Sequence, residues 1–298
     1  MASQLTAPVI RARKGDDRAG EPLVMVTAYD APGARIAAEA GVDLILVGDS
    51  LAMVVLGYDD TLQVTVADMA HHTAAVARGL RGLTPGRAPL PMVIGDLPWM
   101  SYHVSVTDTV LNAAALVKAG AQAVKLEGGS KRVAMVRAIV DAEIPVMGHL
   151  GLTPQSVHAM GGFRVQGKEA GGAELLVAEA QALVEAGVFA IVLEGVPDQV
   201  ARVVTESVAV PTIGIGAGRF CDGQVLVFHD LLGIEDRIAP KFVRRYAALK
   251  ADAVEAMAAF ASDVRSGAFP SDDESYHLGD EAARVLGLYG SEGASKTA

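Results

Sequence analysis

Two short hydrophobic patterns alternate along most of the chain. In the first, a helical stretch ends at an Ala-Gly pair and an apolar run of strand-forming residues follows at once, at 38–48, 117–127 and 184–194. Glycine readily adopts the left-handed conformation that ends a helix, and Val and Ile favour strands. The repeat therefore predicts units in which a helix leads directly into a strand.

The second pattern is an apolar run that opens with proline, at 91–96, 145–149 and 211–216. Proline is tolerated at the first residue of a strand, where its missing N–H costs least. Further runs at 23–28 and 224–229 bring the predicted strands to eight. Between them, helical periodicity covers 66–79, 106–119, 130–142, 172–186 and 197–207, whereas the link 217–223 is too short for a full helix.

Eight strands that alternate with helices predict an α/β fold, a single-domain (β/α)8 TIM barrel, rather than an open doubly wound sheet. The loops at 49–65 and 150–169 are long for this fold. The predicted organisation is an N-terminal arm or helix over 1–22, the barrel over 23–266 with its last helix over 240–266, and a C-terminal extension over 267–298 with a disordered end.

Composition and charge narrow the class of protein. Of 298 residues, 51% are hydrophobic, which allows a large core, and the net charge of −10 disfavours nucleic acid as a partner. The single cysteine, Cys221, cannot form an intrachain disulfide and fits a reducing compartment. Residues 1–20 lack the apolar stretch of a signal peptide, and no run reaches the ~18–20 apolar residues of a membrane span. We therefore expect a soluble, cytoplasmic protein that does not bind a membrane.

The N-terminal arm carries a cluster of positive charge. Arg11, Arg13, Lys14 and Arg18 lie within eight positions of one another. Clustered basic residues near a terminus are usually solvated. We expect these four side chains to form a solvent-exposed face.

Ionisable residues stand where the predicted strands end. Asp49, Asp96, Glu127 and Glu194 end four strands, and His149 ends a fifth. Active sites of TIM barrels lie at the carboxyl ends of the strands, so these side chains are expected to meet. One such carboxylate is as easily a helix cap or a loop salt bridge, but four together repel one another unless a cation offsets their charge.

Oxygen ligands, without a Cys/His cluster at zinc spacing, favour Mg²⁺ at this position. Asp49 and Asp96, on adjacent strands, are the predicted direct ligands, and Glu127 would hold a metal-bound water. Lys125 shares the inward face of its strand with Glu127, so it either meets an anionic substrate group or forms an internal ion pair with Glu127. His149 is a candidate hydrogen-bond donor, although a lone histidine is more often a packed structural residue.

Three further features of the sequence give weaker indications of function. The segment 160–168, with Arg164 and Lys168 among its glycines, is either a mobile lid or a flexible linker. The glycines of 215–218 are similar to the phosphate-binding loops of many barrels, a weak signal alone. His71 and His72 lie within a predicted helix and are expected to be structural.

The order of these motifs resembles the ketopantoate hydroxymethyltransferase family, within the phosphoenolpyruvate mutase-like superfamily of barrels. The resemblance covers about 23–277 and rests on Thr27-Ala28-Tyr29-Asp30, Val47-Gly48-Asp49-Ser50-Leu51, Thr65-Val66-Ala67-Asp68-Met69, Gly95-Asp96-Leu97-Pro98, Val124-Lys125-Leu126-Glu127-Gly128-Gly129, Gly148-His149-Leu150-Gly151-Leu152-Thr153-Pro154-Gln155-Ser156 and Ile213-Gly214-Ile215-Gly216-Ala217-Gly218. The segment 100–103 departs from the family's pattern, and we do not expect it to touch the proposed ligands. The extension after His277 is longer than the family's usual end.

The resemblance implies a Mg²⁺-dependent hydroxymethyltransferase of pantothenate biosynthesis. It would transfer a hydroxymethyl group from 5,10-methylenetetrahydrofolate to 3-methyl-2-oxobutanoate through a Mg-stabilised enolate, giving 2-dehydropantoate. It also implies a cytoplasmic homodecamer built as two pentamers. The family's folate contacts are not assigned to residues of this chain.

The resemblance carries site roles over to individual residues. It implies metal ligation by Asp49 and Asp96, with Glu127 as the outer-sphere carboxylate. The two aspartates together with Ser50, Lys125 and His149 would contact the oxo acid. Glu194 would be the general base.

Two alternatives stay open. A Mg-dependent C–C lyase or mutase acting on another small 2-oxo acid would share the barrel and the two aspartates but need no folate. A non-enzymatic barrel, binding a ligand or acting as a scaffold, would require the ring of strand-end residues to be structural, which is disfavoured because every member falls on the catalytic face. Substrate trials with and without the folate, and Mg²⁺ binding, separate these possibilities.

Overall fold

The computed structural model describes residues 4–14, 21–84, 89–162, 164–237 and 240–286. Eight parallel strands form a closed barrel in which the first strand pairs with both the second and the eighth. The predicted TIM barrel is therefore confirmed. The strands are β1 Leu23–Thr27, β2 Leu44–Val47, β3 Met92–Asp96, β4 Ala123–Glu127, β5 Val146–Gly151, β6 Ala190–Glu194, β7 Thr212–Ile215 and β8 Gly223–Leu226.

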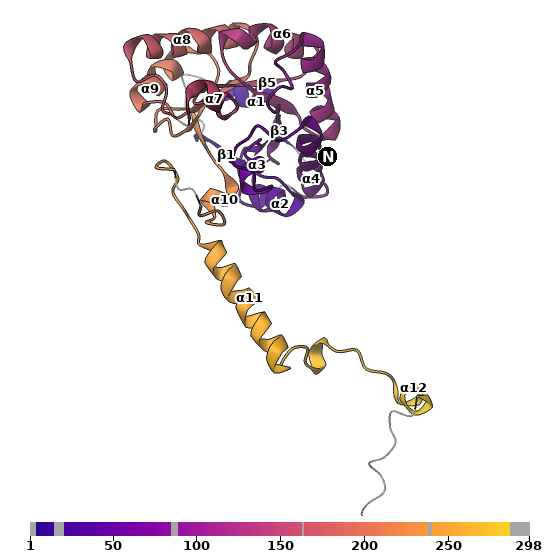
Figure 1. Ribbon diagram of the computed structural model, residues 1–298. Helices are drawn as coiled ribbons and strands as arrows, with labels where there is room; N and C mark the ends of the chain where they lie inside the picture. The colour runs from indigo at the N-terminus through magenta and orange to yellow at the C-terminus, as the bar shows by residue number, and fades with distance from the viewer. Residues whose placement is uncertain (1–3, 15–20, 85–88, 163, 238–239, 287–298) are drawn as a thin grey trace, which may run out of the picture. The chain divides into compact units, whose positions relative to one another are not determined.

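Helices follow the strands in turn and surround the barrel (Figure 1). Two predicted helices, 66–79 and 106–119, match α4 and α5 residue for residue. As expected, β7 and β8 are joined without a helix. The helices are α1 Ala7–Arg11, α2 Ala31–Glu39, α3 Leu51–Val54, α4 Val66–Gly79, α5 Val106–Ala119, α6 Val133–Asp141, α7 Val157–Met160, α8 Ala170–Glu185, α9 Asp198–Ser207, α10 Phe228–Leu231, α11 Leu249–Ser266 and α12 Asp280–Val285, with short 3₁₀ helices η1 Ala12–Lys14, η2 Ser130–Arg132, η3 Pro154–Ser156 and η4 Asp272–Glu274.

The glycines of the repeated Ala-Gly pairs end helices as the pattern predicts. Gly41, Gly120 and Gly187 have φ values of +75°, +116° and +103°. At Gly120 a side chain would also collide with its neighbour, since an added Cβ would lie 2.5 Å from the Cβ of Ala77. Only glycine tolerates both constraints, so the helix stops there and β4 can begin three residues later.

Two predicted boundaries were wrong. The eighth strand was expected over 224–229, but it ends at Leu226 because the Phe228 N–H donates to Thr27 Oγ1 at 3.0 Å and α10 begins. The last helix was expected from 240, but α11 begins at Leu249. The Tyr246 N–H donates instead to the Leu231 carbonyl at 2.8 Å, which holds the preceding segment out of a helix.

The barrel separates two apolar clusters by strand alternation. Side chains on one face of each strand, such as Val26, Ile45 and Val93, pack against the surrounding helices. Those on the other face fill the barrel interior together with Leu5, Ala7 and Ile10 from the N-terminal arm. The arm is therefore part of the core, since Ile10 is fully buried.

The arm also corrects the prediction of a solvated basic face. Arg11 is exposed as expected, but Arg13 forms an ion pair with Asp43 at 3.2 Å, and Lys14 forms one with Asp222 at 2.8 Å. The Lys14 side chain is only 16% exposed. The prediction was wrong for these two residues because their partners lie 30 and 208 positions away, where local sequence gives no sign of them. Arg18 lies outside the described residues.

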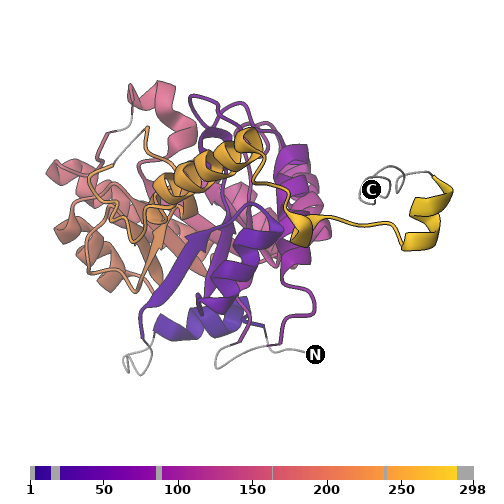
Figure 2. The same ribbon diagram turned by 90° about the horizontal axis from the view of Figure 1, so that it is seen from below.

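The chain forms two compact units, Met1–Ala247 and Ala248–Ala298. Within the second unit, α11 is followed by η4 and α12 (Figures 1 and 2). Gly267, at φ +77°, ends α11, and the Phe260 and Phe269 rings pack 5.3 Å apart. The end of the predicted disordered extension, 287–298, lies outside the described residues. No described helix is long and apolar enough to cross a membrane.

Candidate active site

The predicted strand-end residues come together at the carboxyl end of the barrel. Asp96, Lys125, Glu127, His149 and Glu194 have the same parity along their strands as the interior residues, so they project into the barrel. Strand register completes the arrangement, because Asp96 lies opposite Lys125 and Glu127 lies opposite His149. The apolar interior thus ends in a layer of charged groups.

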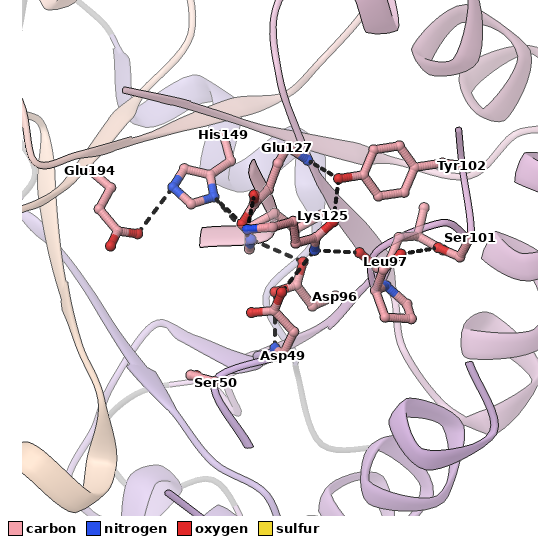
Figure 3. Close-up of polar contacts among 12 residues, drawn as sticks. Asp49, Ser50, Asp96, Leu97, Ser101, Tyr102, Lys125, Glu127, His149 and Glu194 are labelled. Atoms are coloured by element: carbon pink, nitrogen blue, oxygen red, sulfur yellow. Dashed lines mark hydrogen bonds and ion pairs between the residues drawn. The ribbon is translucent and has the colours of Figure 1, made fainter. Parts of the chain in front are cut away.

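Three ion pairs and one close contact between Lys125 and His149 link these groups across neighbouring strands into what we call the ion-pair chain (Figure 3). Lys125 Nζ lies 2.9 Å from Asp96 Oδ1 and 3.2 Å from His149 Nδ1. His149 Nδ1 lies 3.3 Å from Glu127 Oε1, and its Nε2 lies 3.2 Å from Glu194 Oε2. Of the two roles considered for Lys125, an internal ion pair is present, but its partner is Asp96 on the adjacent strand.

Asp49 lies beside Asp96 at the end of β2. Its N–H donates to Asp96 Oδ2 at 3.1 Å, and both side chains are buried. Burial raises the pKa of Asp49 well above its usual range, and the neighbouring charges of Asp96 and Glu127 raise it further. Burial likewise raises the pKa of Asp96, although Lys125 acts in the opposite direction. The positive charge near the two aspartates therefore does not fully offset the cost of ionising them.

His149 is held between two carboxylates. Burial and the charge of Lys125 lower its pKa, but the hydrogen bonds to Glu127 and Glu194 outweigh both and raise it to about 9. The two carboxylates therefore favour the charged form of the imidazole. His149 lies within ion-pair distance of Glu127 on one side and of Glu194 on the other.

Ser50 belongs to the same end of the barrel but not to the ion-pair chain. It precedes α3, and its Oγ lies 2.9 Å from the hydroxyl of Tyr29. Tyr29 is buried at the end of β1, and burial raises its pKa, so the phenol stays neutral. The sequence motif contained Tyr29, yet nothing local to it indicated this contact.

Gln155 and Tyr102 are the polar groups of the site that sequence reasoning missed. The Gln155 side chain donates to Asp49 Oδ2 at 2.8 Å, and the Tyr102 hydroxyl donates to Gln155 Oε1 at 2.6 Å. Tyr102 also accepts from the Glu127 N–H at 3.2 Å. The expectation that segment 100–103 does not touch the proposed ligands was therefore wrong, because the β3–α5 loop folds back over the barrel and buries Tyr102 completely.

The oxygen donors and charges of the site fit a divalent cation. With all four carboxylates ionised, as they would be beside a bound cation, the charges of Lys125 and protonated His149 would leave two negative charges in excess, the charge that one divalent ion offsets. Asp49 and Asp96 supply hard oxygen ligands of the kind Mg²⁺ prefers. Within the described ranges no cluster of three or more His, Cys, Asp or Glu is arranged to hold an ion directly, so the fit is to two carboxylates supplemented by other oxygens.

Other sequence candidates lie away from this cluster of contacts. His72 Nδ1 contacts the Tyr29 carbonyl at 2.6 Å from within α4, which is a structural role as expected. Gly216 and Gly218 both have positive φ values, and a side chain at these positions would collide with Phe242 and Asp198 respectively. Backbone geometry and close packing therefore explain why glycine occupies both positions. In the segment 160–168, which was predicted to be either a mobile lid or a flexible linker, the Gln166 N–H donates to the Gly195 carbonyl at 2.9 Å, next to Glu194.

A model of the ketopantoate hydroxymethyltransferase family matches residues 5–272. The chain belongs to this family. The 3-methyl-2-oxobutanoate hydroxymethyltransferase of Syntrophobacter fumaroxidans is 52% identical over 97% of this chain and 99% of that protein. The protein of the same name from Ignicoccus hospitalis is 56% identical over 85% of this chain and 93% of that protein. The chain is accordingly an enzyme, a hydroxymethyltransferase.

Solved structures of more distant proteins share the barrel of this family. Phosphonopyruvate hydrolase superposes with a TM-score of 0.58 at 16% identity, covering 95% of this chain and 96% of that one. A 2,3-dimethylmalate lyase, described as a PEP mutase/isocitrate lyase superfamily member, gives a TM-score of 0.56 at 20% identity, with 96% of each chain covered. At these identities the likeness concerns the fold alone.

Proposed function

We propose that this enzyme transfers a hydroxymethyl group from 5,10-methylenetetrahydrofolate to 3-methyl-2-oxobutanoate, giving 2-dehydropantoate, with Mg²⁺ held by Asp49 and Asp96. The observation that carries the proposal is the buried pair of aspartates with raised pKa values. Asp96 is paired with Lys125, which contacts His149, and His149 in turn is paired with Glu194. The names of the relatives supply the substrate.

The metal site would use groups already in place. Asp49 and Asp96 would bind Mg²⁺ directly, and Glu127 would hold one of its waters. When bound, the ion supplies Lewis-acid stabilisation of negative charge on the oxygens of the 2-oxo acid. Lys125 and the hydroxyl of Ser50 would hold the substrate carboxylate.

Glu194 would remove the proton from C3 of the oxo acid. It is the most exposed member of the ion-pair chain, at 16%, so a substrate can approach it from the barrel opening. The Glu194 carboxylate lies 3.2 Å from His149 Nε2, and this ion pair would hold the carboxylate beside the imidazole. The electron pair left on C3 conjugates with the carbonyl as an enolate and forms the new C–C bond to the methylene carbon of the folate as one of its two C–N bonds breaks. Water then replaces the second nitrogen on that carbon, which leaves the hydroxymethyl group and releases tetrahydrofolate, whose two nitrogens take up the proton from C3 and one proton of the water.

The first test is exchange of the C3 proton. The full-length enzyme is incubated with 3-methyl-2-oxobutanoate and Mg²⁺ in deuterated water, and loss of the C3–H signal is followed by NMR. Glu194→Gln should slow this exchange by roughly 10²–10⁴-fold, the usual contribution of a general base. Glu206→Gln, which alters an exposed glutamate on α9, is the matched control. Exchange at the wild-type rate in Glu194→Gln removes Glu194 as the base.

Product analysis tests the reaction as a whole. We expect 2-dehydropantoate only when the oxo acid, methylenetetrahydrofolate and Mg²⁺ are all present. Cleavage or rearrangement of a 2-oxo acid without the folate would instead establish the lyase or mutase alternative.

The remaining expectations concern the state of the protein in the cell. We propose a cytoplasmic homo-oligomer, a decamer by family resemblance, that binds neither nucleic acid nor membrane. Sedimentation of the purified enzyme measures the size of the assembly.

A further inference from the structure

Gln155 contacts more of the site than any residue singled out from the sequence. It lies in η3 after β5 and is 4% exposed. Its Nε2 donates to Asp49 Oδ2 at 2.8 Å and to the Leu97 carbonyl at 3.0 Å. Its backbone N–H donates to Glu127 Oε2 at 3.0 Å. One residue thus bonds to groups at the ends of β2, β3 and β4.

The direction of the Gln155 amide follows from its neighbours. The Leu97 carbonyl can only accept a hydrogen bond, so the amide NH₂ group must face it and Asp49. Oε1 then faces Tyr102, whose hydroxyl donates to it at 2.6 Å while accepting from the Glu127 N–H. Every polar atom of the Gln155 side chain therefore has a partner, and the reversed amide would set oxygen against oxygen.

Backbone constraints at the end of β5 place Gln155 beside the carboxylates of the site. Gly151 ends β5 at φ +92°, and a Cβ at this position would lie 2.2 Å from the Glu194 carbonyl. The Leu152 N–H donates to that same carbonyl at 2.8 Å. The chain is thereby turned inward over the barrel opening, which brings Gln155 above Asp49 and Glu127.

We propose that Gln155 is a positioning residue that orients Asp49, and through its backbone N–H Glu127, for binding Mg²⁺. The role rests on the proposed function, since it requires the metal site. Gln155 is suited to it because an amide donates to a carboxylate without adding charge, whereas Lys125 and His149 supply the positive charge on the other side. Hydrogen-bonded partners of metal-binding carboxylates typically change metal affinity by 10–100-fold when removed.

Mg²⁺ binding to the full chain without substrate tests the role directly. Titration calorimetry should give a Kd roughly 10–100-fold weaker for Gln155→Leu than for the wild type. Gln122→Leu is the matched control, because Gln122 is also a largely buried glutamine, which accepts from the Val93 N–H at the opposite end of β3. This variant should lose thermal stability and keep the wild-type Kd for Mg²⁺.

Kinetics supply a second readout that a merely structural role would not move. In Gln155→Leu the Mg²⁺ concentration needed for half-maximal rate should rise, and kcat at saturating Mg²⁺ should recover toward the wild-type value. If Gln155→Leu does not fold, Gln155→Asn replaces it, because it keeps the amide but withdraws it by one methylene group and should likewise weaken Mg²⁺ binding.

The outcomes separate this role from the metal assignment. A folded Gln155 variant that binds Mg²⁺ as tightly as the wild type overturns the positioning role alone. A wild-type protein that does not bind Mg²⁺ overturns the metal site and the role of Gln155 with it.

Discussion

The barrel holds a Lys–Asp ion pair at each end, partly buried at the amino-terminal end and fully buried at the carboxyl-terminal end, and the two differ in their surroundings. At the amino-terminal end, Asp222 Oδ2 accepts from Lys14 at 2.8 Å, from the Thr212 N–H at 2.9 Å and from the Thr212 hydroxyl at 3.2 Å. Lys14 also donates to the Thr205 carbonyl at 2.6 Å. Each charged group there is surrounded by groups that complement it, so the pair joins the N-terminal arm to the barrel.

At the carboxyl-terminal end, the Lys125–Asp96 pair lies among competing charges. Asp96 Oδ1, Glu127 Oε1 and His149 Nε2 are buried and lie within ion-pair distance of a partner, yet none of these three atoms has a well-directed hydrogen bond. Burial raises the pKa values of Asp49 and Asp96. The same residue types therefore stabilise the fold at the amino-terminal end. At the carboxyl-terminal end they leave uncompensated repulsion between buried carboxylates, which a bound cation would relieve.

The largest expected effect is on activity, from removing the charge of Asp96. If Asp96 binds Mg²⁺ as proposed, Asp96→Asn should lower kcat/KM on the order of 10³-fold, because the loss of a metal ligand would remove several kcal/mol of transition-state stabilisation. High Mg²⁺ should partly restore the rate. The melting temperature of the metal-free protein should change little, because Lys125 keeps the nearby carboxylates of Glu127 and Asp49 and the repulsion between Asp49 and Asp96 is removed. An unchanged Mg²⁺ requirement would contradict the ligand role.

The matched change at the other end should have the opposite outcome. Asp222→Asn leaves the ammonium of Lys14 without its charged partner and should cost about 2 kcal/mol in the free energy of unfolding. This is less than the ~3–5 kcal/mol of a fully buried pair, because these side chains are 16% and 12% exposed. Denaturant unfolding measures the loss, and kcat should stay at the wild-type value. A lowered kcat in the folded variant would show that the two ends are not independent.

The smallest effect is a gain in stability from Asp49→Asn, and it depends on pH. The unfolded pKa of an aspartate is about 3.9, and burial raises the folded value well above it. Between these values the folded protein binds more protons than the unfolded chain, so its stability falls as the pH rises. Asp49→Asn avoids this loss and should stabilise the metal-free protein by ~1 kcal/mol at pH 7, with the difference vanishing near pH 4.

Mg²⁺ provides the control for this prediction. Saturating Mg²⁺ should raise the melting temperature of the wild type and leave Asp49→Asn unaffected, because only the wild type keeps both ligands. If Asp49→Asn proves less stable than the metal-free wild type at pH 7, burial of the Asp49 carboxylate does not destabilise the metal-free protein.

Contacts within one strand differ from contacts between distant segments in how far local sequence predicts them. The inward direction of Lys125 and Glu127 followed from alternation along one strand, and the position of Glu194 followed from the end of another. By contrast, Lys14 meets Asp222 across 208 positions, and Gln155 meets Asp49 across 106. Such contacts depend on how loops and termini close over the barrel, which no local pattern encodes.

Local patterns in the amino-acid sequence were enough to predict the eight strands, the end of the barrel at which the ionisable groups gather, and the parity that directs them inward. These features follow from periodicities of two and 3.6 residues and from glycines that end helices, all of which act over a few neighbouring positions. The pairings depend on the folded barrel, in which Lys125 contacts Asp96, His149 lies between two glutamates, and Gln155 contacts both Asp49 and Glu127. Register between strands and the inward turn after β5 set these distances, and both are properties of the closed barrel.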